Sequence, residues 1–88
     1  MRESQITPAV ERLAAIIQIP TVSRQPGREP VLTDDGRDPF DVLLETMAAQ
    51  WPGVHALEQH RMGHHGLLIR WPGTGGERPI VLMAHLDV

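Results

Sequence analysis

The chain has 88 residues, the length of one small domain or of a piece of a larger one. Its net charge is −3, with acidic and basic residues mixed along the sequence, which argues against a nucleic-acid surface because such surfaces need clustered positive charge. It contains no cysteine, so disulfides and thiolate metal sites are excluded, and a metal would have to be held by His, Asp or Glu.

Two features of the sequence set the expected location. The N-terminal stretch MRESQITPAVERL lacks the apolar core of a secretory signal. The longest apolar run, Ile80 to Ala84, is too short to span a bilayer. We therefore expect a cytoplasmic protein with no membrane partner.

A first helix is expected over residues 8–18. Thr7 suits the N-cap position and Pro8 the first helical position, and Pro20 ends the pattern. The spacing i, i+3, i+4, i+7 gives this helix one apolar face, formed by Val10, Leu13, Ala14 and Ile17.

A long irregular loop and a second helix follow. Residues 20–38 are rich in proline, glycine and charge and show no period, and loops of this length are often functional or mobile. Asp38 and Pro39 form a helix start, and Pro52 ends the helix, which is expected over residues 39–51. Its apolar face contains Phe40, Leu43, Leu44, Met47 and Trp51.

The sequence after residue 53 predicts three strands. Partial alternation indicates a strand at about 54–61, and Gly63 marks a turn before a short strand at 66–71. The segment 79–85 is apolar without alternation, which is typical of an interior strand that is buried on both faces. The expected fold class is α/β, with two helices followed by three strands of a mixed sheet.

The sequence His85-Leu86-Asp87 is the leading candidate for chemistry. Residues two apart on a strand point the same way, so His85 and Asp87 would share a face at its carboxyl end, where ligands bind in open α/β sheets. The His would bind a metal through one ring nitrogen while the carboxylate fixes its tautomer through the other. The His-x-Asp triplet alone is a weak motif, and its position after the most apolar stretch strengthens it.

The other polar motifs favour ordinary structural roles. His64 and His65 are neighbours that would face opposite sides of a strand, so both cannot easily hold one ion. His55 and His60 fit partly exposed strand positions. The stretch PGTGGERP lacks the features of a phosphate-binding loop. Ser4 and Ser23 are the only serines, and neither belongs to a recognisable nucleophile set.

Several segments in order resemble a known family. IQIPTVS, WPGVHALE, HGLLIRWPG and PIVLMAHLDV are similar to the N-terminal landmarks of the co-catalytic dizinc metallopeptidases (peptidase family M-twenty), which include carboxypeptidase S, aminoacylase and the glutamate carboxypeptidases. The carboxypeptidase S-like branch is the most similar. The resemblance covers nearly all of residues 1–88 and implies that they are the N-terminal fragment of the catalytic domain.

The resemblance also implies roles for two residues. His85 would ligate one zinc ion, and Asp87 would support the metal site as an active-site residue. Two zinc ions would activate a water that attacks the amide bond of a peptide or an N-acyl amino acid, with a separate Glu as general base. The other ligands and that Glu lie downstream in such enzymes, so we expect the isolated 88 residues to hold no dizinc centre and to be inactive.

Two alternatives to an enzyme fragment stay open. A small non-catalytic α/β module could bind a partner through its apolar strand edge. A stand-alone metal-binding domain could instead use His60, His64, His65 and His85.

Overall fold

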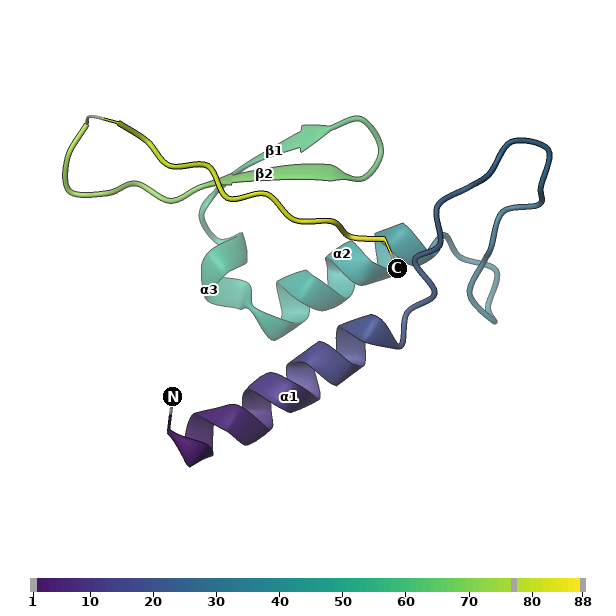
Figure 1. Ribbon diagram of the computed structural model, residues 1–88, viewed down its shortest axis with the longest axis horizontal. Helices are drawn as coiled ribbons and strands as arrows, with labels where there is room; N and C mark the ends of the chain where they lie inside the picture. Colours follow the sequence, from purple (N-terminus) through teal and green to yellow (C-terminus); the bar gives the residue numbers. More distant parts are fainter. Residues whose placement is uncertain (1, 77, 88) are drawn as a thin grey trace.

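The fold begins with two helices joined by a long loop, in a computed structural model that describes residues 2–76 and 78–87. α1 spans Glu3–Ile17 and α2 spans Pro39–Gln50. Figure 1 shows α1 lying below α2, with the loop between them projecting beyond the helix ends. α2 therefore forms almost where the sequence predicts it, one residue shorter at its end.

α1 starts at Glu3, ahead of the predicted start at Pro8. The side chain of Gln5 accepts a hydrogen bond from the Arg2 backbone N–H at 3.0 Å, and Glu3 places a negative charge near the positive end of the helix. These interactions stabilise a helix start before the proline. Thr7 consequently lies inside the helix and does not cap it.

A short helix replaces the beginning of the predicted strand 54–61. α3 spans Pro52–His55, because Pro52 suits a first helical position and the backbone N–H groups of His55 and Ala56 bond to the carbonyls of Trp51 and Pro52. The partial alternation in this segment is equally compatible with one helical turn. The strand β1 begins only at Glu58.

The two strands form an antiparallel hairpin. β1 spans Glu58–Met62 and β2 spans Gly66–Arg70, with Glu58 opposite Arg70 and Met62 opposite Gly66. Gly63 turns the chain between them with a φ of 65°, a conformation that favours glycine. β2 thus lies within its predicted range of 66–71, and the class is α/β, with helices followed by a two-stranded sheet.

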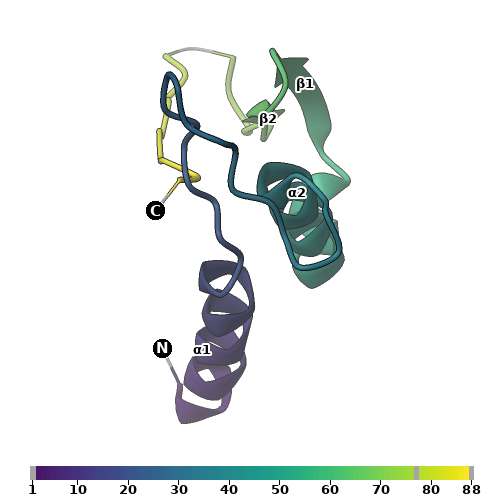
Figure 2. The ribbon, with the colours of Figure 1, turned by 90° about the vertical axis from the view of Figure 1, so that its right-hand side faces the viewer.

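The predicted interior strand 79–85 is not formed in the described residues. The segment runs without strand pairing, and its apolar side chains face solvent, with Leu82 93% and Met83 91% exposed. A strand needs partners for its backbone groups, and in the described part of the chain the sheet contains only β1 and β2. Figures 1 and 2 show this yellow segment passing the hairpin and ending beside the loop that follows α1.

The core is small. Leu43 and Leu44 of α2 are 4% exposed, whereas the predicted apolar face of α1 faces solvent, with Val10, Leu13 and Ile17 all more than half exposed. The radius of gyration is 15.5 Å, compared with about 12 Å for a compact domain of this length. The chain is therefore loosely packed and leaves much apolar surface uncovered.

Among the residues that the structure describes, none of the helices combines the length and hydropathy of a membrane span.

Candidate functional site

His85 and Asp87 lie close together at the end of the C-terminal segment. The Nδ1 atom of His85 is 3.3 Å from Oδ1 of Asp87, so the two side chains face each other, as two residues separated by one in an extended segment can. The imidazole is 93% exposed and the carboxylate 38% exposed. The ring is therefore not buried among aliphatic side chains.

Ser23 is a third member of this cluster. Its hydroxyl donates a hydrogen bond to Oδ2 of Asp87 at 2.7 Å, so each carboxylate oxygen has a partner. The two residues are 64 positions apart, and no sequence pattern indicated a role for Ser23. One signal pointed to it: Ser23 is the last residue of IQIPTVS, a segment that carries the family resemblance.

The segment before Ser23 contains a buried threonine and two tight turns. Thr21 is 1% exposed, and its backbone N–H bonds to the carbonyl of Ile19 at 2.8 Å. Val22 makes the same contact with Pro20, also at 2.8 Å. These consecutive tight turns fix the backbone that presents the Ser23 hydroxyl to Asp87.

The electrostatics of the cluster favour an ionised carboxylate. The hydrogen bond from Ser23, followed by the one from His85, lowers the pKa of Asp87 below its usual value. A neutral His85 that donates its Nδ1 proton to this carboxylate carries its lone pair on Nε2. That tautomer leaves Nε2 free to bind a metal ion.

The ligand count limits what the cluster can do alone. A catalytic zinc site has three protein ligands. Among the described residues, His85 and Asp87 do not belong to any group of three side chains that could hold an ion. By itself, the His85–Asp87 pair can bind a metal ion through one ring nitrogen, Nε2 of His85.

A different group of potential ligands lies at the start of α2. Asp38, Asp41 and His65 each place one ligand atom within 4.8 Å of the others. The sequence patterns did not indicate this group, because they connected His65 only with other histidines and not with Asp38 or Asp41. The set considered there, His60, His64, His65 and His85, does not form such a group within the described ranges.

Two further histidines have local partners. The Nδ1 atom of His55 lies 3.0 Å from the carbonyl oxygen of Trp51, one helical turn earlier. His60 lies 3.3 Å from the carboxylate of Glu58 on the same strand. Neither contact brings these rings to His85.

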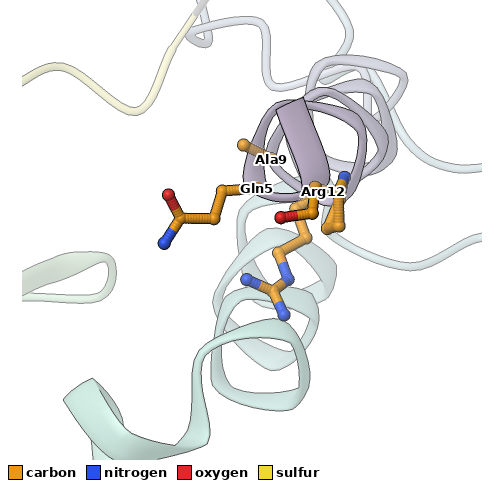
Figure 3. A pocket seen from close by; sticks show the side chains of 5 residues that line it. Gln5, Ala9 and Arg12 are labelled. Atoms are coloured by element: carbon orange, nitrogen blue, oxygen red, sulfur yellow. The ribbon is translucent and has the colours of Figure 1, made fainter. Parts of the chain in front are cut away.

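One hollow on the described surface lies away from the candidate residues. It is an open depression along α1, lined by Ser4, Gln5, Pro8, Ala9 and Arg12. Figure 3 shows Gln5 and Arg12 extending from this one helix in different directions around Ala9. Because a single helix lines it, the depression is a feature of the helix surface and not an enclosed substrate pocket.

Comparison with known proteins finds a distant relative. The chain is 30% identical over 82 residues to carboxypeptidase S of Saccharomyces cerevisiae, an alignment that covers 91% of this chain. The chain spans 14% of the length of that curated relative. No protein-family model matches the chain, and no solved structure matches it significantly.

Proposed function

Because this chain is a distant relative of carboxypeptidase S and corresponds in size to a fragment of it, we propose that it forms the N-terminal part of the catalytic domain of a zinc-dependent peptidase or amidohydrolase. The proposed substrates are peptides and N-acyl amino acids, whose amide bond is hydrolysed. The observation that carries the proposal is the His85–Asp87 contact at 3.3 Å, in which an exposed imidazole is paired with a carboxylate.

Each residue of the cluster has a distinct role in this proposal. His85 binds a zinc ion through Nε2. Asp87 accepts the Nδ1 proton of His85 and so holds the ring in the metal-binding tautomer. Ser23 positions Asp87 through its hydrogen bond to the second carboxylate oxygen. Bound zinc would supply Lewis-acid activation of water and of the substrate carbonyl.

The remaining ligands and the general base belong, in this proposal, to further polypeptide. A catalytic zinc ion needs about three protein ligands, and the cluster offers one strong ligand in His85. The chain aligns with only 14% of its relative, so most of the residues of that relative have no counterpart in these 88 residues. We expect the 88 residues alone to show no hydrolase activity.

The proposal is tested on the protein expressed from the complete open reading frame that encodes these residues. Its product is expected to hydrolyse dipeptides or N-acyl amino acids, and chelation should abolish the activity because the attacking water is metal-activated. His85→Ala should abolish the activity and lower the zinc content measured by mass spectrometry. His60→Ala, which changes an exposed histidine outside the cluster, should change neither. An inactive product without zinc would contradict the proposal.

The exposed segment Ile80–Met83 favours a second candidate, a non-catalytic α/β module that binds a partner through this apolar surface. That candidate predicts a cooperative thermal unfolding transition of the isolated chain that is unchanged by zinc. An aggregated or non-cooperative sample would argue against it.

A further inference from the structure

α1 carries a line of exposed apolar side chains along its length. A helix of a folded domain normally turns its apolar stripe toward the core. Here four apolar side chains, all between 45% and 60% exposed, form the α1 seam: Ile6, Val10, Leu13 and Ile17. The partly buried residues Ala9 and Ile16 lie to one side of this seam. The part of the chain that the structure describes therefore leaves the seam uncovered, on a helix at the lower edge of the molecule in Figures 1 and 2.

The spacing of the α1 seam suits contact with another helix. Its members follow one another at intervals of four, three and four residues, which is the a/d pattern of a coiled coil. At 3.6 residues per turn they lie within an arc of about 60°, the width of the strip that one neighbouring helix covers. Ala9 and Ala14 flank the seam, and such small side chains let a second helix approach closely.

The size of the seam favours an occupant from the same polypeptide over a second copy of the chain. A stable interface between proteins takes about 20–30 residues on each side, whereas the seam offers four exposed side chains on a helix of 15 residues. A tethered segment needs less contact area, because the tether keeps its effective concentration high. The chain also spans only 14% of the length of its relative, which leaves ample polypeptide to supply such a segment.

We propose that a helix of the further polypeptide packs along the α1 seam, a contact that rests on the proposed function because the further polypeptide belongs to it. The occupying helix carries apolar residues at intervals of three and four, which fill the spaces between the seam residues. Ile6 and Ile17 are 11 positions apart, or about 17 Å along the helix, so the contact takes about three turns of the partner. It would also anchor α1, and with it the segment that leads to Ser23, to the rest of the protein.

The test measures how fast single cysteines are alkylated in the protein expressed from the complete open reading frame. The 88 residues contain no cysteine, so peptide mass spectrometry identifies each introduced thiol. Leu13→Cys should react roughly 10- to 100-fold more slowly than Glu11→Cys, the factor that corresponds to burying one apolar side chain. Glu11→Cys is the matched control, because Glu11 is exposed on the same helix away from the seam. In the isolated 88-residue chain both positions are exposed, and the two thiols should react at similar rates.

Cross-linking identifies the kind of segment that covers the seam. Val10 and Ile17 are seven positions apart, or about 10.5 Å along α1. A short cross-linker attached to Val10→Cys or to Ile17→Cys should therefore reach two points of the further polypeptide that are about seven residues apart in a helix but only about three apart in a strand. Cross-links with the spacing of a strand, or cross-links between two copies of the protein, would overturn the proposal.

Equal alkylation of Leu13→Cys and Glu11→Cys in the complete protein would also overturn it. Val10→Cys changes the side-chain volume less and repeats the measurement if Leu13→Cys disturbs folding. Zinc content and hydrolase activity of the Glu11→Cys protein test the proposed function separately. An active zinc protein whose seam thiols react as fast as the control would contradict the helix contact and leave the proposed function standing.

Discussion

Asp87 is the residue on which the candidate site depends, because both of its oxygens are engaged. Ser23 donates to one oxygen at 2.7 Å and His85 lies 3.3 Å from the other. A carboxylate with two such partners is restricted in rotation, and it restricts the imidazole in turn. The orientation of His85 therefore depends on a serine that does not contact it directly.

Removal of the Ser23 hydroxyl should raise the pKa of Asp87. Its hydrogen bond is the main cause of the lowered value, so Ser23→Ala should move the pKa back toward that of a free carboxyl group. Because the folded-state pKa lies below the unfolded one, Asp87 stabilises the fold above the unfolded pKa, and this contribution is lost as the pH falls through the folded pKa. NMR titration of the Asp87 carboxyl carbon measures the change, and Ser4→Ala, at the only other serine, should leave it unaltered.

Alternation along an extended segment was enough to predict that His85 and Asp87 lie together. The partner of Asp87 could not be predicted in this way, because Ser23 reaches it from 64 residues away. The same holds for His65, whose approach to Asp38 depends on how the hairpin packs on α2. Contacts between distant segments depend on tertiary packing, which local patterns do not specify.

The cap of α2 should make a measurable contribution to stability. Asp38 accepts the Phe40 N–H through Oδ1, so Asp38→Ala should lower the free energy of unfolding by about 1 kcal/mol. Asp38→Asn keeps a capping oxygen and should cost much less. Urea denaturation followed by far-ultraviolet circular dichroism compares the two variants. An equal loss of stability in both would show that charge, and not capping, is what Asp38 contributes to the helix.

The turn of the hairpin should depend on the conformation of Gly63. Its φ of 65° is strained for other residues, so Gly63→Ala should destabilise the hairpin by about 1–2 kcal/mol. Gly73 has open space around its α-carbon and no positive φ, so Gly73→Ala is the matched control. Amide hydrogen exchange of β1 and β2 should accelerate only in the Gly63 variant.

Sequence patterns located the helices and strands best where start and stop residues agree with the hydrophobic period. α2 has a capping Asp, a proline at the first position and a proline after its end, and it forms within one residue of the expected range. The segment 79–85 has strong strand composition but no neighbour to pair with in the described fold. Amino-acid composition indicates which segments favour a strand conformation, whereas backbone pairing with a neighbouring strand determines whether the strand forms.

The uncovered apolar surface should make the isolated chain prone to association. Ile80, Leu82 and Met83 are all at least 87% exposed, in a segment whose backbone is not paired in a sheet, so the segment offers both apolar surface and unpaired backbone groups to another chain. Leu82→Glu should keep the chain monomeric at higher concentration, as measured by light scattering. Gln25→Glu adds the same charge in an exposed loop and should have little effect. Equal improvement in both variants would attribute solubility to net charge alone.

The contact between Ser23 and Asp87 also has a consequence for biosynthesis. Its two ends are separated by 64 residues, so the ribosome must add that length of chain after Ser23 before its partner exists. At about 5–20 residues per second, this takes about 3 to 13 seconds. The Ser23–Asp87 contact can therefore form only after the residues of α2 and of the hairpin, which lie between its two ends in the sequence, have been added to the chain.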